Sequence, residues 1–201
     1  MLRFDRISCI YKAIADYDAV LVIADARPEL RARALLNRGT ALGKRGEPDK
    51  EIADYDAMLA MPETLAEDRA RALVNHGIAR GKRGDPDNAI TDFDAALAIP
   101  QAQAEYRARA LVNRGVAWLK RRESEKATAD FNAVIAMGDA PADLVSDARN
   151  RAELVALAQL IEPDGSPKGT KPRSKARRAN QKQYPRPRKA PAKTTGRKRP
   201  A

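Results

Sequence analysis

The sequence predicts an all-α fold of stacked helix pairs, and the main reason is a block that returns every 38 residues. The motif Ala-Asp-Tyr-Asp-Ala at residues 15–19 recurs with small changes at 53–57, 91–95 and 129–133. A second motif, Asn-x-Gly, keeps the same spacing at 37–39, 75–77 and 113–115. A fixed period of this length is typical of arrays in which each unit covers the apolar face of its neighbour. Only 4% of the residues are aromatic, whereas alanine is abundant, which suits closely packed helices.

The array is predicted to begin with a half unit at about residues 1–24. Ile14, Tyr17 and Leu21 follow the spacing of one apolar helix face, and they correspond to the second helix of the later units. Because the pattern starts in mid-unit, two alternatives stay open: the array truly begins with a half unit, or residues upstream of the given start have been lost. Three complete units are predicted to follow at about 25–62, 63–100 and 101–138, and then a capping helix at about 141–161.

The middle unit carries the clearest helix signals. Its first helix is predicted from about 65 to 83, with Gly84 as the stop. Asp85 is a typical N-cap, and Pro86 fits the first helical position, where a missing N–H is tolerated. The second helix is predicted to end before Pro100. One unit is therefore a helix, a tight turn, a second helix and a short link.

The other units repeat these signals with some changes. The first complete unit has Gly46, Pro48 and Pro62 in the same places, whereas the third replaces the Gly-x-Pro turn with Arg122-Glu123-Ser124, so its turn is less clearly predicted. The capping helix is expected to end the stack with a polar outer face. The residues that predict this face are Asp147, Arg149, Asn150, Arg151 and Glu153.

Over about residues 11–161 the sequence resembles the tetratricopeptide repeat family. The small residue in the middle of the first helix is matched by Gly39, Gly77 and Gly115, and the aromatic residue of the second helix by Tyr55, Phe93 and Phe131. Leu42, Trp118, Ala89 and Ala127 match further positions, while Arg80 and Glu51 depart from the pattern, as does the 38-residue unit, which is four longer than usual. The resemblance implies a right-handed superhelical solenoid of antiparallel helix pairs whose concave side is lined by the first helices. A mid-helix glycine costs about 1 kcal/mol, so its return in three units favours a packing role.

The resemblance also implies that the first helices bind a partner. Positions four, seven and eleven residues apart share one helix face, and three such positions form ladders of Arg, Asn and Lys. Asparagine can pair with an extended peptide backbone, and the cations can bind carboxylates. We therefore predict a groove for an extended or helical acidic segment; the alternative is a solvated face that repeats only through gene duplication. The predicted groove residues are Arg33, Asn37, Thr40, Lys44, Arg71, Asn75, Ile78, Lys82, Arg109, Asn113, Val116 and Lys120.

Some family members bind a C-terminal carboxylate with a clamp of two lysines, two asparagines and an arginine. This chain matches the clamp only at Asn75 and, with Arg in place of Lys, at Arg109. Leu36, Thr40 and Asn113 stand where the clamp needs Lys, Asn and Arg. A clamp of that type is therefore not expected.

The sequence predicts no catalytic, metal or cofactor site. His76 is the only histidine, and it is interpreted as a surface substitution because Arg38 and Arg114 occupy the same position in other units. The pairs Asp54/Asp56 and Asp92/Asp94 are two residues apart, so on a helix they face different ways, and they are interpreted as solvent or inter-repeat charges. The Gly-Lys-Arg-Gly stretches lack phosphate-loop spacing and end a helix where such a loop would open one.

Charge is distributed very unevenly along the chain. Residues 163–201 hold fourteen Lys and Arg against one acid, Asp164, which leaves 24 of the 38 basic and 26 of the 27 acidic residues to residues 1–162. With many prolines and little apolar surface, 163–201 is predicted to be a disordered basic tail, and 1–162 to be the repeat domain. The tail is expected to coat nucleic-acid phosphates, to lie on an anionic membrane, or to act as a solubilising segment that contacts acidic proteins.

Non-enzymatic protein binding is the function that these features predict, with a nucleic-acid-associated protein as the alternative. In that alternative the tail supplies affinity and the repeats recruit a partner. One cysteine, Cys9, allows no internal disulfide, and neither an export signal nor an apolar run of membrane-spanning length is read, so a cytoplasmic location is expected.

Overall fold

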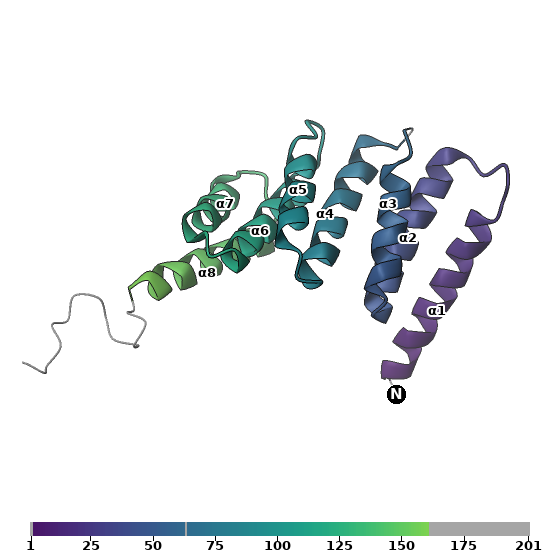
Figure 1. Cartoon of the computed structure of the whole chain (residues 1–201), viewed down its shortest axis with the longest axis horizontal. Coiled ribbons are helices and arrows are strands. Elements are labelled where there is room, and N and C mark those ends of the chain that lie inside the picture. Colours follow the sequence, from purple (N-terminus) through teal and green to yellow (C-terminus); the bar gives the residue numbers. More distant parts are fainter. Residues whose placement is uncertain (1, 63, 161–201) are drawn as a thin grey trace, which may run out of the picture. The chain divides into compact units, whose positions relative to one another are not determined.

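The computed structural model describes residues 2–62 and 64–160, with side chains from Ile7 onward. Within Met1–Gln159, which form one compact unit, the described residues fold into eight helices and no strands (Figure 1). The all-α prediction is confirmed. The helices are α1 (Leu2–Leu21), α2 (Pro28–Arg45), α3 (Pro48–Leu59), α4 (Ala66–Lys82), α5 (Pro86–Leu97), α6 (Ala104–Lys120), α7 (Ser124–Ala136) and α8 (Ala142–Gln159).

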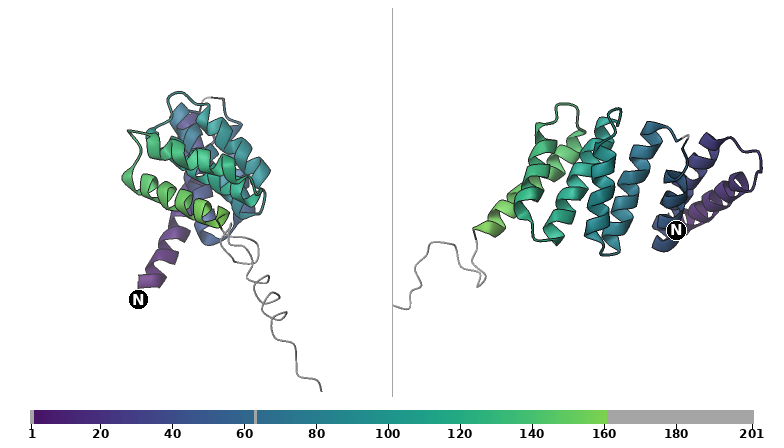
Figure 2. Two further views of the ribbon diagram at one scale, coloured as in Figure 1. Left: turned by 90° about the vertical axis from the view of Figure 1, so that its left-hand side faces the viewer. Right: turned by 45° about the horizontal axis from the view of Figure 1, so that its top comes forward.

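The helices pack as antiparallel pairs stacked in chain order, as the repeat predicts. The pairs are α2/α3, α4/α5 and α6/α7, with α1 before them and α8 after them (Figures 1 and 2). The first helices also contact one another directly, α2 with α4, α4 with α6 and α6 with α8. Among the described residues no such backbone contact joins α3 to α5 or α5 to α7. The first helices therefore lie closer together than the second helices, which places them on the inner side of the array.

All three turns within the pairs have the same backbone geometry. Gly46 and Gly84 have φ angles of 85° and 84°, the left-handed conformation that glycine adopts without strain. In the third turn Arg122 takes this conformation with φ 63°. The next residue donates back to the last turn of the helix in each case, with N···O distances of 2.9–3.1 Å from Glu47 to Leu42, Asp85 to Arg80 and Glu123 to Trp118. Arg122-Glu123-Ser124 thus forms the turn despite lacking glycine.

The second helix of each pair begins where the sequence signals predict. Pro48 and Pro86 are the first residues of α3 and α5. The Asp85 carboxylate accepts a hydrogen bond from the Asn88 backbone N–H at 3.2 Å, so the predicted N-cap is present.

Each repeated glycine lies under the aromatic ring of its own unit. A Cβ built on Gly39, Gly77 or Gly115 would come within 2.5–2.9 Å of the ring of Tyr55, Phe93 or Phe131 respectively. All three rings are at most 1% exposed. The glycines therefore allow the second helix to approach the first-helix backbone, which confirms their predicted packing role.

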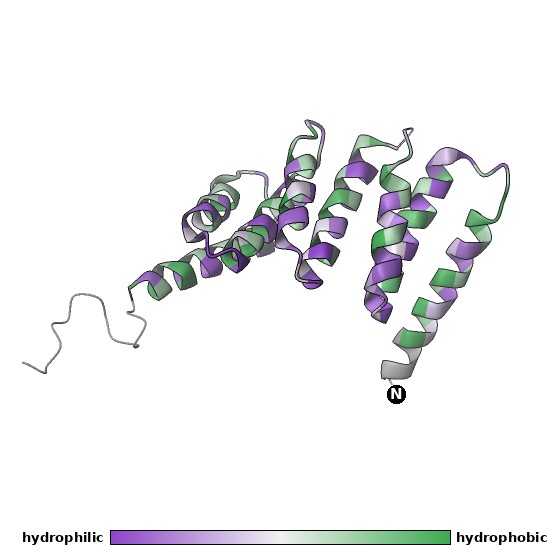
Figure 3. Ribbon diagram, in the orientation of Figure 1, coloured by the Kyte–Doolittle hydropathy of each residue, from purple (hydrophilic) through white to green (hydrophobic). Residues whose placement is uncertain are grey.

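Apolar and polar residues alternate along every helix, so each helix turns an apolar face toward its neighbours (Figure 3). The end helices expose part of that apolar surface. In α8, Arg149, Asn150 and Glu153 are exposed as predicted, but Leu154 and Leu157 are more than half exposed beside them. The prediction of a polar outer face on the capping helix is therefore only partly right. The predicted tail at 163–201 lies outside the described residues.

Candidate partner-binding face

The twelve predicted groove residues lie on α2, α4 and α6, the helices of the inner side. We call this set the first-helix face. Arg33, Lys44, Lys82 and Lys120 are exposed, and the other eight are half-buried. The face is thus a half-buried surface of amides and small apolar groups with lysines at the carboxyl end of each helix.

Two of the three arginines of the first-helix face contact a neighbouring unit, and the third, Arg109, pairs with Glu105 of its own helix. The Arg33 Nε lies 3.1 Å from the Asp68 carboxylate of α4, and the Arg71 guanidinium donates to the Asn37 amide oxygen at 3.1 Å. The Asn113 amide donates to the Arg109 carbonyl of its own helix at 2.8 Å. The contacts of Arg33 and Arg71 join the adjacent helices α2 and α4. Fewer arginines are therefore available for a partner than the sequence predicts.

The lysines have fewer internal partners. Within residues 2–62 and 64–160, Lys44 and Lys82 make no hydrogen bond or ion pair, and Lys120 donates to the Gly81 carbonyl. Lysine is a flexible point charge that reaches a carboxylate without a fixed geometry. The available positive charge of the first-helix face is therefore carried by lysine.

Most residues of the first-helix face line one of two surface cavities, which we call hollows. The α1–α2 hollow, of about 250 Å³, brings together Asn37, Thr40, Lys44 and Arg71 beside α1. The α4–α6 hollow, of about 160 Å³, brings together Ile78, Lys82, Asn113, Val116 and Lys120. Arg33 lines a third hollow near the α1–α2 link, whereas Asn75 and Arg109 line none of the three.

A buried polar cluster, which sequence reasoning missed, lies between α2 and α3. The Tyr55 hydroxyl is 3.1 Å from the Thr40 hydroxyl and donates to the Glu51 carboxylate at 3.4 Å. Burial raises the pKa of Tyr55 to about 12, although Thr40 and Asn75 oppose the rise. Burial also raises the pKa of Glu51, against the attraction of Lys82. The signal was present in the sequence, because Thr40, Glu51 and Tyr55 are polar replacements in the same unit.

A second missed feature is a set of three aspartate–cation–aspartate rungs that join the units. Arg38 lies 2.6 Å from both Asp18 and Asp54, and Arg114 pairs in the same way with Asp94 and Asp130. These bonds raise the pKa of both arginines above the usual range. In the three complete units the first aspartate of the motif, Asp54, Asp92 or Asp130, is buried and contacts its own unit, whereas the second aspartates that take part in rungs, Asp18, Asp56 and Asp94, are exposed and contact the next unit. The inter-repeat interpretation therefore holds only for the second aspartate.

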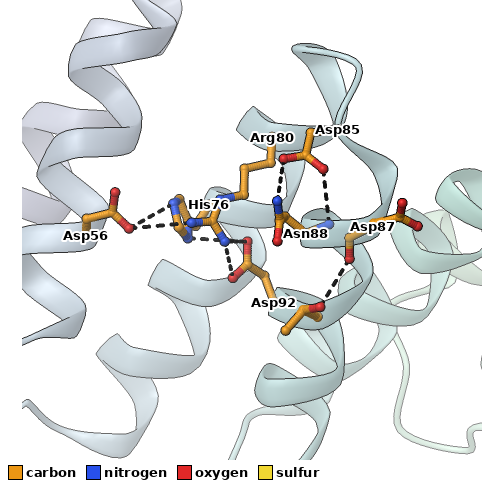
Figure 4. Close-up of polar contacts among 8 residues, drawn as sticks. Asp56, His76, Arg80, Asp85, Asp87, Asn88 and Asp92 are labelled. Atoms are coloured by element: carbon orange, nitrogen blue, oxygen red, sulfur yellow. Dashed lines mark hydrogen bonds and ion pairs between the residues drawn. The ribbon is translucent and has the colours of Figure 1, made fainter.

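The middle rung corrects the interpretation of His76, which is not a surface residue but 1% exposed (Figure 4). Its Nε2 lies 3.4 Å from Asp56 and its Nδ1 lies 3.3 Å from Asp92. Neither nitrogen has a hydrogen-bond partner among the described residues, so the imidazole lies between the two carboxylates without hydrogen-bonding to them. Arg80, one turn further along α4, lies 3.0 Å from Asp92 and 3.6 Å from Asp56 and supplies the charge that Arg38 and Arg114 supply elsewhere. The same residue explains the departure from the family pattern at position 80.

No set of three or more His, Cys, Asp or Glu side chains within the described part of the chain is arranged to hold a metal ion. None of the eight helices is both long and apolar enough to cross a membrane.

Comparison with known proteins identifies the fold. No family model and no curated protein matches the sequence. Solved structures do match, and two of them each show 20% identity, a TM-score of 0.53 and 64% of this chain covered. One is the first TPR domain of Spaghetti (RPAP3) bound to the HSP90 peptide SRMEEVD, of which 94% is covered; the other is the first TPR domain of human RPAP3, of which 91% is covered. With the stacked pairs and the glycine–aromatic contacts, the match shows that this chain has the tetratricopeptide repeat fold.

Proposed function

We propose that the protein is a non-enzymatic scaffold that binds an acidic segment of a partner protein along the first-helix face. The observation that carries the proposal is the set of lysines 38 residues apart, Lys44, Lys82 and Lys120, on adjacent inner helices. Lys44 and Lys82 have no acidic partner among the described residues, and hollows open beside all three. Carboxylates spaced along an extended segment would complement this row of charges.

One of the matching solved structures supports an acidic partner segment. The RPAP3 domain is recorded with a peptide whose sequence, SRMEEVD, is rich in acidic residues. Leu36 is fully buried in this chain, and with Thr40 and Asn113 it occupies positions where a carboxylate clamp needs Lys, Asn and Arg. The proposal is therefore an acidic segment bound through lysines, without a clamp for a chain end.

The test is capture by the full chain with and without the lysines. We expect Lys44→Gln, Lys82→Gln and Lys120→Gln together to reduce the amount of each specifically captured protein about tenfold, while the far-UV helix signal stays unchanged. The matched control replaces three lysines away from this face, Lys12, Lys50 and Lys126, and should capture normally. If the first-helix variant retrieves the same proteins in the same amounts, the proposal is wrong.

A second candidate function rests on the composition of residues 163–201, with fourteen basic residues and one acidic. In this alternative the basic segment holds nucleic acid and the repeats recruit a partner. For either function we propose a cytoplasmic location.

A further inference from the structure

The first two complete units, α2/α3 and α4/α5, differ at three positions where their two helices meet. The first unit has Thr40, Glu51 and Tyr55, whereas the second has Ile78, Ala89 and Phe93 in the same places. The first set is hydrogen-bonded and polar. The second set is apolar, so equivalent surfaces of the two units differ in chemistry.

The two units also differ in whether the space beneath the inner face is filled. In the first unit the Glu51 carboxyl lies directly over Gly43, where any added Cβ would collide with it. In the second unit the nearest atom to a Cβ on Gly81 would be the Ala89 Cβ, at 3.7 Å. Ala89 stands where the first unit has Glu51, and its short side chain leaves the α4–α6 hollow open above Gly81. Phe93 and Val116 are among the residues that line this hollow.

The size of the hollow limits what can enter. A volume of about 160 Å³ is close to that of an apolar protein cavity of about 150 Å³, which accepts benzene. One branched aliphatic side chain fits such a space, whereas an indole is too large. Because the lining is mainly apolar, an aliphatic side chain gains more from burial there than a charged or amide side chain, which loses part of its hydration.

The rim of the hollow determines which chain segment can bring that side chain. Lys82 and Lys120 line it from α4 and α6, and Asn113 adds an amide. Both lysines are exposed. Acidic residues on either side of an aliphatic residue would therefore meet a cation on each helix, and the next lysine, Lys44, continues the row on α2.

From this geometry we propose that the α4–α6 hollow is the anchor of the scaffold and takes one aliphatic side chain, leucine or valine, from an acidic partner segment. The inference rests on the proposed function and adds the residue class at one position. The buried carboxylate of Glu51 fills the equivalent space one unit earlier, so the segment cannot place its aliphatic side chain at that unit instead.

The experiment uses the full chain and hexapeptides of sequence Asp-Glu-Xaa-Glu-Glu-Asp, with fluorescein on the N-terminal amine, an amidated C-terminus, and Gly, Leu, Val or Trp at Xaa. All four peptides carry the same charge, so attraction to the basic segment 163–201 contributes equally and cancels in the comparison. We expect the leucine and valine peptides to bind about tenfold or more tightly than the glycine peptide, because burial of a whole aliphatic side chain provides at least this much. The tryptophan peptide should not show this gain.

Two variants fill the hollow in different ways. Ala89→Glu copies the arrangement of Glu51, and Ala89→Met fills the space without charge. Both should reduce the preference for leucine over glycine to less than about twofold, and circular dichroism identifies either variant that does not fold. The matched control, Glu51→Ala with Tyr55→Phe, alters the neighbouring unit and should keep the leucine preference at Xaa.

The outcomes separate this inference from the proposed function. If folded Ala89 variants keep the full leucine preference, the anchor is wrong, while loss of binding in the triple lysine variant would still support the scaffold. An absence of leucine preference in the wild-type protein also contradicts the anchor. If the preference disappears as protein concentration rises, a second copy of this chain occupies the hollow, and the proposed partner is wrong.

Discussion

Gly77 of α4 is crowded by a neighbouring side chain, whereas Gly81 of the same helix has open space beside it. Replacing each by alanine therefore distinguishes the effect of crowding on stability from the effect of helix propensity. At Gly77 an added Cβ would lie 2.7 Å from the Phe93 ring, which is held on both sides in the core. We expect Gly77→Ala to lower the free energy of unfolding by about 1–3 kcal/mol, as overpacking does. At Gly81 the nearest atom is 3.7 Å away, so Gly81→Ala should raise it by up to about 1 kcal/mol. Urea unfolding measures both, and equal effects would contradict the role assigned to Gly77.

The carboxylate of Glu51 is expected to make stability depend on pH. Burial raises its pKa above the ordinary value of 4.5, so the folded state holds the proton more tightly than the unfolded chain. Its contribution to stability is complete below pH 4.5 and is lost as the pH rises through the folded pKa. Glu51→Gln should therefore match the wild type near pH 4 and become increasingly more stable by comparison toward pH 7, as measured by urea unfolding at each pH.

Glu47 provides a control of opposite sign for this measurement. Its hydrogen bonds with Arg45 and Lys50 lower its pKa to about 2, so its contribution is present above pH 4.5 and is lost as the pH falls toward 2. Glu47→Gln should be less stable than the wild type at pH 7 and should match it near pH 2. The same pH trend in both variants would show that the buried environment of Glu51 is not the cause.

At the scale of the element, the aspartate–cation–aspartate rungs link each second helix to the first helices on either side. In the last rung Asp130 is buried, whereas Asp94 is exposed. We expect Arg114→Met to cost about 2–4 kcal/mol, because it leaves Asp130 buried without a partner. Asp94→Asn should cost less than about 1 kcal/mol, since Asp94 is in contact with water.

A double-mutant cycle tests the pairing itself. Asp130→Asn should be markedly less destabilising in the Arg114→Met background than in the wild type, because the charge it removes no longer has a partner. Urea unfolding of the four proteins gives the coupling free energy. Additive effects would contradict the assignment of Arg114 as the partner of the buried carboxylate.

The helices and turns were predictable from the sequence because their signals are local. Asp85, Pro86 and Gly84 act on the backbone next to them, and the 38-residue repeat showed which helices must stack. The residues within the rungs were harder to assign. Analogy with Arg38 predicts His76 on the surface, yet Arg38 is half-buried and His76 fully buried, and both lie between aspartates 16 and 20 residues away. Repeat analogy identifies equivalent positions but not their exposure, which is set by contacts between elements.

The same limit applied to the candidate site. The positions of the first-helix face followed from helix periodicity and were correctly assigned to three adjacent helices. Periodicity could not show that Arg33 and Arg71 are occupied by Asp68 and Asn37, because those partners come from other units. It also could not show that Ala89, at the position equivalent to Glu51, lies beside a hollow. A shorter side chain opens a space only when no neighbouring residue fills it.

For the whole molecule, the uneven charge predicts two separable binding activities. Residues 1–162 have 24 basic and 26 acidic residues, whereas 163–201 have fourteen basic and one acidic. We expect the full chain to bind random 30-base-pair duplex DNA with an affinity that falls steeply with salt, about 10³-fold or more between 50 and 200 mM if six or more phosphates are neutralised. A chain truncated after residue 162 should lose this binding, because its net charge is slightly negative.

The same truncation distinguishes the two candidate functions, because the lysines of the first-helix face remain in place. The truncated chain should keep the leucine preference toward the acidic hexapeptides, and DNA should not compete with that preference in the full chain. Fluorescence anisotropy with labelled duplex and labelled peptide measures both activities in one sample. If truncation leaves the salt dependence of DNA binding unchanged, the duplex binds to the repeats. The first-helix face would then be a phosphate-binding surface, and the scaffold proposal would be wrong.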